Sequence, residues 1–192
     1  FIQKLEDDPT IEFKNMHSLY DGLRNNEFND KYFIAWKKGL TGFPFLDACM
    51  RFLKAHGWIN FRMRAMLISF ASYHLWLHWK ITADFLASLF IDYEPGIHYS
   101  QVQMQSGTTG INSIRIYNPI KQGKDHDPNG IFIRKWIPEL SNVPDSHIHT
   151  PWLSNLKLKN YPVPLVDERI ARNEAAKKIY NIRNSKKFKE QS

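Results

Sequence analysis

Residues 60–80 read NFRMRAMLISFASYHLWLHWK and are apolar on nearly every side of a helix. Two arginines near the start are followed by leucine, isoleucine, phenylalanine, tyrosine and tryptophan. A helix that is apolar all round belongs in a protein interior, because no face of it suits water. The sequence therefore predicts a central helix over 60–80, with other elements packed around it.

The chain before this stretch also shows helical patterns. Apolar residues recur at helical spacing over 10–25, and a short helix over 32–38 ends at Gly39. Pro44 and Gly57 are typical of the start and the end of a further helix. This part of the chain predicts three helices in succession.

The chain after the central stretch is helical with one long interruption. Thr82 is a candidate N-cap for the next helix, and the segment 107–130 is rich in Gly, Asn and Pro, which predicts a loop. A short helix ended by Pro138 and a final basic helix follow. We find neither repeats nor the alternation typical of strands, so the predicted fold class is all-α, a helical bundle.

The composition limits the class of protein. A chain of 192 residues with 43% hydrophobic and 14% aromatic residues is typical of one ordered domain or a large piece of one. No apolar run is long enough to cross a bilayer, and the acidic start does not resemble a signal peptide. The single cysteine, Cys49, excludes a disulfide framework and fits a reducing compartment. The sequence predicts a cytoplasmic protein without membrane contact.

The net charge of +7 is concentrated near the C-terminus. Between Arg169 and Lys189 there are eight basic residues and one acid, Glu174. A solvated basic helix face is the ordinary interpretation, and contact with phosphates is the alternative. The sequence predicts a helical domain over 1–166 and a basic C-terminal helix or tail over 167–192.

The two arginines of the central stretch need separate explanations. Arg62 and Arg64 are two residues apart, so a helix points them to different sides. Arg64 lies among apolar neighbours, and a buried guanidinium needs a carboxylate partner. Asp92 and Glu94, in the segment DYEPGIHYSQVQMQSG (92–107), are the nearest acidic candidates. The pair is either a structural link between helices or part of a site that also faces a polar ligand.

The histidines do not predict a metal site. His74 and His78 have helical i, i+4 spacing, but they lie among tryptophans without a third ligand nearby. His147 and His149 are two residues apart in a predicted loop. We also find no phosphate-binding glycine loop and no nucleophile elbow, so the chain shows no motif for conventional kinase or hydrolase chemistry.

Five motifs follow one another between Thr41 and Trp152. They read TGFPFLDACMR (41–51), GWINFRMR (57–64), LWLHW (75–79), an acid-x-acid pair at 92–94, and RIYNPIKQGKDHDPNGIFIRKWIPEL (115–140). Together they resemble the DNA photolyase and cryptochrome family, in its C-terminal helical domain, which binds FAD. The resemblance implies FAD as the cofactor and implies that the segment after Asp92 lines the flavin cavity.

The resemblance also implies roles for individual residues. Arg64 matches an arginine that pairs with the first acid beside the flavin N5 edge, where a fixed cation favours the anionic reduced flavin. His98 falls where the family presents a small polar group to N5, and Trp79 matches one tryptophan of the family's electron relay. Both are assigned to electron transfer. The residues implied in FAD binding are Trp58, Phe61, Arg64, Asp92, Glu94, Ile97, His98 and Gln101.

Damaged DNA is the partner that the resemblance implies. Arg62 and Arg115 match arginines that approach the DNA backbone, a role that suits a guanidinium. Met104 stands where a tryptophan is expected to stack on the lesion. The family's N-terminal antenna domain and its phosphate-cradling loop have no counterpart in this chain. The resemblance thus implies a piece of a larger protein, with FAD held by the full-length protein.

Departures from the family pattern leave three functions open. Val102 and Asn26 stand where two relay tryptophans are expected, and Phe61 and Ala65 stand where dimer-repairing enzymes carry Asn and Met. The favoured function is a light-driven DNA repair enzyme of the deoxyribodipyrimidine photolyase type. Such an enzyme is a carbon–carbon lyase that passes an electron from reduced FAD to a pyrimidine dimer. The alternatives are a cryptochrome-like flavoprotein that signals without repair, and a helical scaffold without flavin.

Overall fold

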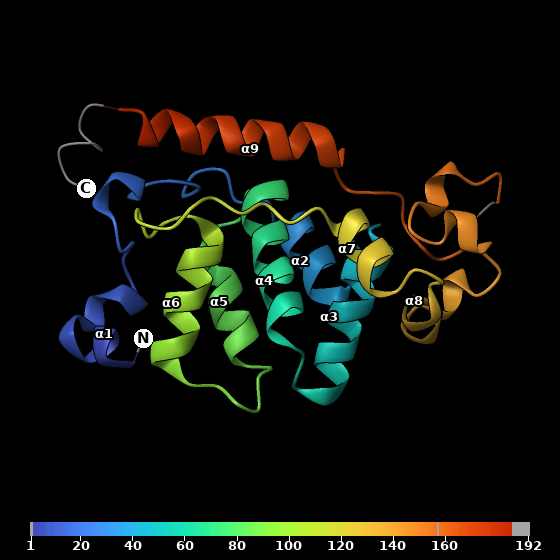
Figure 1. Cartoon of the computed structure of the whole chain (residues 1–192), viewed down its shortest axis with the longest axis horizontal. Coiled ribbons are helices and arrows are strands. Elements are labelled where there is room, and N and C mark those ends of the chain that lie inside the picture. Colours follow the sequence, from blue (N-terminus) through green and yellow to red (C-terminus); the bar gives the residue numbers. More distant parts are fainter. Residues whose placement is uncertain (1, 157, 186–192) are drawn as a thin grey trace.

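The computed structural model describes residues 2–156 and 158–185, and no strand occurs within them (Figure 1). The predicted all-α class is therefore confirmed. Short 3-10 turns and one π-helical turn, η3 (Phe70–His74), connect the α-helices. The α-helices are α1 (Ile2–Asp7), α2 (Asp30–Lys38), α3 (Pro44–His56), α4 (Phe61–Ser69), α5 (Trp79–Ala87), α6 (Pro95–Ser106), α7 (Pro119–His126), α8 (Ile131–Trp136) and α9 (Glu168–Arg183).

The helices form a row with the central stretch in its middle. In Figure 1, α6, α5, α4 and α3 follow one another across the molecule, with α1 outside α6 and α8 beyond α3. Met66, Leu67 and Phe70 from the central stretch have no exposed surface and lie in the largest apolar cluster. None of the helices in the described ranges is long and apolar enough to span a membrane.

The predicted central helix is buried as expected, but it is interrupted. α4 passes into η3, and the chain then leaves the helix until α5 begins at Trp79. Trp76 in this break has a φ of 53°, a left-handed conformation that is uncommon outside glycine. The charged groups of Arg24 and Lys178 lie over its indole, at 4.5 and 4.4 Å from the ring centroid. Contacts with distant parts of the chain thus prevail over the local helical pattern.

The helix predicted over 10–25 is wrong. This segment forms two short 3-10 turns, η1 (Pro9–Glu12) and η2 (Ser18–Tyr20). Gln103 on α6 is fully buried and binds the backbone between them. Its amide nitrogen donates to the carbonyls of Ile11 and Lys14 at 2.7 and 2.8 Å, and its oxygen accepts from the N–H of Met16 at 2.8 Å. Backbone groups held by this side chain are not free to form a helical ladder.

Two further details differ from the sequence prediction. His78 caps α5, whereas Thr82 lies inside that helix and its hydroxyl donates to the carbonyl three residues earlier. The predicted loop over 107–130 contains α7, with Asn118 as its N-cap. Thr and Asn are common both at helix N-caps and elsewhere, so the residue type alone does not show where a helix begins.

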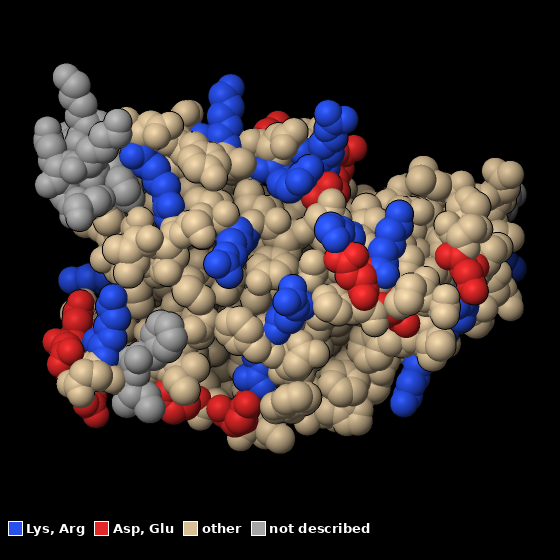
Figure 2. Space-filling model, in the orientation of Figure 1, with Lys and Arg blue, Asp and Glu red and all other residues tan. Residues whose placement is uncertain are grey.

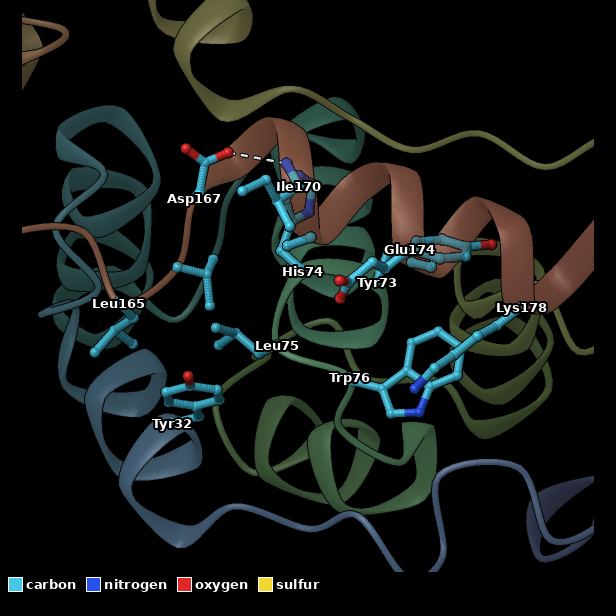
Figure 3. Close-up of a pocket in the computed structure, with 13 residues that line it drawn as sticks. Tyr32, Tyr73, His74, Leu75, Trp76, Leu165, Asp167, Ile170, Glu174 and Lys178 are labelled. Carbon is cyan, nitrogen blue, oxygen red and sulfur yellow. Dashed lines mark hydrogen bonds between the residues drawn. The ribbon is translucent and has the colours of Figure 1, made fainter.

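The C-terminal helix α9 runs along one edge of the row and packs on η3, the turn that continues α4 (Figure 1), and basic side chains follow it along that edge (Figure 2). Ala175 and Ile179 are buried against Tyr20 and Tyr73, in a small cluster separate from the main core. A groove of about 330 Å³ lies between α9, α2 and the turn that carries Trp76 (Figure 3). The predicted tail beyond residue 185 lies outside the described residues, and the division at 166/167 stays a prediction.

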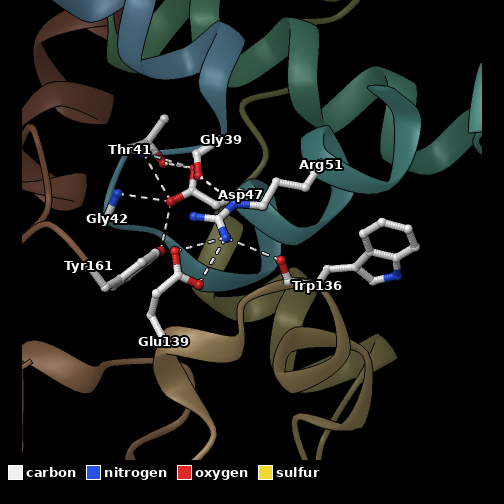
Figure 4. A network of polar contacts seen from close by, with 8 residues as sticks. All are labelled: Gly39, Thr41, Gly42, Asp47, Arg51, Trp136, Glu139 and Tyr161. Atoms are coloured by element: carbon white, nitrogen blue, oxygen red, sulfur yellow. Dashed lines mark hydrogen bonds and ion pairs between the residues drawn. The ribbon is translucent and has the colours of Figure 1, made fainter. Parts of the chain in front are cut away.

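A closed polar network fixes the start of α3 (Figure 4). Asp47 is fully buried and accepts four hydrogen bonds, from the N–H and hydroxyl of Thr41, the N–H of Gly42 and the hydroxyl of Tyr161, at 2.7–3.0 Å. Burial raises the pKa of Asp47 to about 6, and the hydrogen bonds oppose that shift. This network ties α3 to residue 161, far along the chain.

Candidate cofactor and nucleic-acid site

The acid-rich segment before α6 is explained first by helix capping. Glu94 is the N-cap of α6, and its two carboxylate oxygens accept from the N–H groups of Gly96 and Ile97 at 3.2 and 2.7 Å. Pro95 occupies the first helical position, where its missing N–H has no consequence. One acid, the proline and the glycine thus serve to begin the helix.

Asp92 forms the predicted ion pair with Arg64. The Arg64 Nη2 lies 2.9 Å from the Asp92 Oδ2, and the Arg64 Nε donates to the carbonyl of Ile59 at 2.6 Å. The guanidinium also lies over the ring of Phe90, 4.2 Å from its centroid. The expected full burial is wrong, because the side chains of Arg64 and Asp92 are 20% and 47% exposed. The pair is fixed by several contacts and still open to a ligand.

His98 is buried beside this pair and is held in one orientation. Its Nε2 lies 2.9 Å from the carbonyl oxygen of Ala83, which can only accept, so Nε2 carries the proton and Nδ1 keeps its lone pair. The rings of Phe90, Tyr93 and Tyr99 surround the imidazole, with centroids 5.2–5.8 Å away. Burial lowers the pKa of His98. The imidazole is therefore neutral near pH 7 and presents an acceptor.

The remaining residues implied in cofactor binding leave an apolar face exposed. Trp58, Phe61 and Ile97 are 48%, 57% and 48% exposed, unusual values for such large apolar side chains. They lie at the starts of α4 and α6, which the Arg64–Asp92 pair joins. The side-chain oxygen of Gln101 is buried and has no hydrogen-bond partner among the described residues. Flat apolar surface, a fixed ion pair and an unused acceptor together fit the rings and polar edges of a flavin.

Trp79, assigned to electron transfer, is almost completely buried at 1% exposure. Its Nε1 donates to the side-chain oxygen of Asn15 at 2.7 Å. Sequence reasoning missed Asn15, because it lies in the segment wrongly predicted as a helix. It also missed Gln103, which holds that segment in place. Gln101 and Gln103, two residues apart on α6, therefore point to different sides and have separate roles.

Two of the three residues implied in DNA binding lie together. Met104 and Arg115 line one small cavity. Arg62 is exposed on the first turn of α4. Its charge adds to the lowered pKa of Asp125 on α7, which is due mainly to a hydrogen bond from Lys121. Arg62 therefore lies near Asp125 on α7, whereas Arg115 lies in the segment between α6 and α7.

The comparisons with known proteins agree with one another. The chain is 38% identical over 152 residues to the deoxyribodipyrimidine photo-lyase of Alkalihalophilus pseudofirmus, covering 73% of this chain and 32% of that protein. It is 35% identical over 161 residues to the cryptochrome DASH of Gloeobacter violaceus, covering 78% and 32%. The chain thus spans about a third of the length of these relatives.

Solved structures share the fold. A bacterial class III photolyase from Agrobacterium tumefaciens matches with a TM-score of 0.83 and 30% identity, covering 95% of this chain and 40% of that one. An archaeal photolyase from Sulfolobus tokodaii, solved with two FAD molecules, matches with a TM-score of 0.84 and 33% identity, covering 92% and 40%. The family described as the FAD binding domain of DNA photolyase matches residues 1–181. The chain belongs to this family, whose cofactor is FAD.

Proposed function

We propose that this chain is the FAD-binding part of a light-driven DNA repair enzyme of the photolyase type. The observation that carries the proposal is the Arg64–Asp92 pair, fixed at 2.9 Å on an exposed apolar face beside a neutral, immobilised His98. A structural ion pair alone would not require large apolar side chains to stay exposed around it. We also propose a cytoplasmic location, because the single cysteine is free, as in a reducing compartment.

The residues of this face divide the tasks of holding FAD. Trp58, Phe61 and Ile97 offer apolar surface to the flat rings. Arg64 and Asp92 present fixed opposite charges at a polar edge, and the Gln101 side-chain oxygen accepts from a donor of the ligand. Glu94 contributes indirectly, since its carboxylate holds the first turn of α6 in place. When bound, FAD supplies the light absorption and the electron chemistry.

His98 and Trp79 are the residues proposed for electron transfer. The Nδ1 of His98 accepts a hydrogen bond from an N–H at the ligand edge, which favours a ligand form that carries that proton. Trp79 is an oxidisable indole shielded from water in the core. The pair lies on two helices in direct contact, α5 and α6.

Damaged DNA is the proposed substrate. Arg62 and Arg115 are both exposed and bind backbone phosphates, while Met104 offers apolar contact to a base. The alternative is a cryptochrome-like flavoprotein that does not repair DNA. It is supported by the likeness to cryptochrome DASH and by the apolar Val102 and Met104 in place of expected tryptophans.

The test uses the full-length protein. Purified protein should carry FAD in its visible absorption spectrum, and under blue light it should restore cyclobutane pyrimidine dimers in DNA to intact pyrimidines. FAD without repair of any pyrimidine lesion would favour the cryptochrome-like alternative. A colourless protein that does not take up added FAD would contradict both and leave a helical scaffold.

A further inference from the structure

A hydrogen-bond chain runs from the buried Trp79 to the surface. The indole Nε1 donates to the Asn15 Oδ1 at 2.7 Å, and the Asn15 Nδ2 donates to the Asp21 carboxylate at 2.9 Å. An indole N–H can only donate and a carboxylate can only accept. The residue between them must therefore accept on one side and donate on the other, which an amide does and a carboxylate does not.

Asn15 is held in place from both sides. The buried Gln103 amide binds the carbonyl of Lys14 and the N–H of Met16, the two chain neighbours of Asn15. The same amide oxygen accepts from the hydroxyl of Thr108 at 3.0 Å, so it cannot turn easily. The amide of Asn15 is thus preorganised against the indole.

Trp76, three residues earlier, has the opposite surroundings. Its Nε1 donates to a carboxylate, Glu27, at 3.0 Å, and two cations, Arg24 and Lys178, lie over its ring (Figure 3 shows Lys178). A cation on the ring disfavours loss of an electron from it, while a carboxylate at the N–H is a base. Trp79 has neither. Its ring stacks on His78, whose pKa is lowered by burial and by the charge of Arg24.

We propose that Asn15 is a positioning residue that keeps Trp79 protonated when Trp79 gives up an electron. The inference rests on the proposed role of Trp79 as electron donor. With FAD bound and excited by light, Trp79 would give up one electron to the oxidised cofactor, and its indole would become a radical cation that keeps its N–H proton. The amide oxygen of Asn15 is too weak a base to take that proton. The electron returns without any proton having to move, so the step is reversible.

The test exchanges the two ends of the chain. The double variant Asn15→Asp/Asp21→Asn places a carboxylate against the indole and an amide at the surface, so both hydrogen bonds and the total charge are kept. A carboxylate in that position accepts the N–H proton, which gives a neutral tryptophan radical and a carboxylic acid. A positioned base accelerates proton transfer by roughly 100-fold or more, so the radical should lose its proton that much sooner. Its recombination should slow, because the proton must return with the electron.

The measurement is time-resolved absorption after a flash on the FAD-loaded full-length protein. The protonated and the neutral tryptophan radicals have different visible spectra. The parent protein and Asp21→Asn should both show the protonated radical, and the double variant should show the neutral one. Glu27→Gln, which gives Trp76 an amide partner, should match the parent.

Three outcomes would overturn the inference. One is the same radical spectrum and lifetime in the parent and the double variant. Another is a neutral radical in the parent itself, and a third is a change in Glu27→Gln, which would place the radical on Trp76. FAD content in the same samples separates these outcomes from failure of the proposed function, in which no FAD is bound. Circular dichroism confirms that the exchanged pair leaves the fold intact.

Discussion

Asp47 lies in the first turn of α3 and Asp92 lies just before α6, but the two carboxylates differ in burial and in their number of partners. Asp47 is fully buried and accepts four hydrogen bonds from within the chain (Figure 4). Asp92 is half-exposed, has one partner in Arg64 and adjoins exposed apolar side chains. The first region uses its polar groups completely, so it has nothing to offer a ligand. The second leaves charge and apolar surface open and holds a buried amide oxygen without a partner among the described residues, and these are properties of a binding site.

The largest effect should come from removing the buried carboxylate. Asp47→Ala strands two backbone N–H groups and two hydroxyls in the interior, so the free energy of unfolding should fall by roughly 3–5 kcal/mol. Urea-induced unfolding of the full-length protein measures this, with Asp92→Ala as the comparison. Equal losses of unfolding free energy in Asp47→Ala and Asp92→Ala would contradict the contrast between the two regions.

Asp92→Ala should act on the ligand more than on the fold. An exposed ion pair contributes about 1 kcal/mol or less to stability. A hydrogen bond from a charged group to a ligand contributes about 1.5–3 kcal/mol, so FAD affinity should fall by roughly 10–100-fold. Fluorescence titration with FAD measures the loss.

Asp145→Ala is the matched control for that substitution. Asp145 pairs with Arg134 at 2.6 Å, and its side chain is 69% exposed against 47% for Asp92. The control should change stability equally little and leave FAD affinity unaltered. Equal losses of FAD affinity in both variants would show that Asp92 has no particular place at the cofactor.

The sequence predicted the helix ends and the ion pair of the open site from the residue types and the order of the elements. Gly39 and Gly57 end their helices in left-handed conformations as expected, and the Arg64–Asp92 pair follows from an arginine in an apolar stretch. The prediction failed where one side chain reaches across the chain. Gln103 binds residues about 90 positions away, and no local pattern announces that partnership.

The break at Trp76 could not be predicted for the same reason. Its backbone is left-handed, and its indole contacts Arg24 and Lys178, which come from opposite ends of the sequence. The apolar pattern over 60–80 correctly predicted that this stretch is buried, but it did not predict that the helix is interrupted. The exposure of Asp92 could not be predicted either, because a possible ion pair in the sequence does not show how much of it is exposed to solvent.

Acid should weaken the open region through His98. Burial lowers its pKa from the ordinary 6.5. Between that value and the lowered pKa, the unfolded chain binds a proton at His98 and the folded chain does not. Stability present above pH 6.5 is therefore lost as the pH falls toward the lowered pKa. His98→Phe keeps a ring among Phe90, Tyr93 and Tyr99 and should flatten the dependence of unfolding free energy on pH below 6.5. A slope unaltered by His98→Phe would contradict the assignment.

Asp47 should respond to pH in the opposite direction. Its folded pKa of about 6 lies above the ordinary 3.8, so the folded chain binds the extra proton. The stabilisation that comes from binding this extra proton is fully present below pH 3.8 and is lost as the pH rises through 6. Carboxyl NMR of Asp47 should show its midpoint near pH 6. A midpoint below 4 would mean that its four hydrogen bonds outweigh burial.

The smallest effects should come from the exposed arginines proposed to contact DNA. Each phosphate contact adds about one unit to the slope of log affinity against log salt, and it is indifferent to base sequence. Arg62→Ala and Arg115→Ala in the full-length protein should each lower that slope by about one and weaken binding equally for damaged and undamaged duplexes. Lys135→Ala, at an exposed cation on α8, is the matched control and should leave the slope unchanged. Because the two arginines lie on separate elements, their effects should add in the double variant. If neither substitution changes the slope, the exposed charges beside the open site do not face DNA, and the cryptochrome-like function gains support over repair.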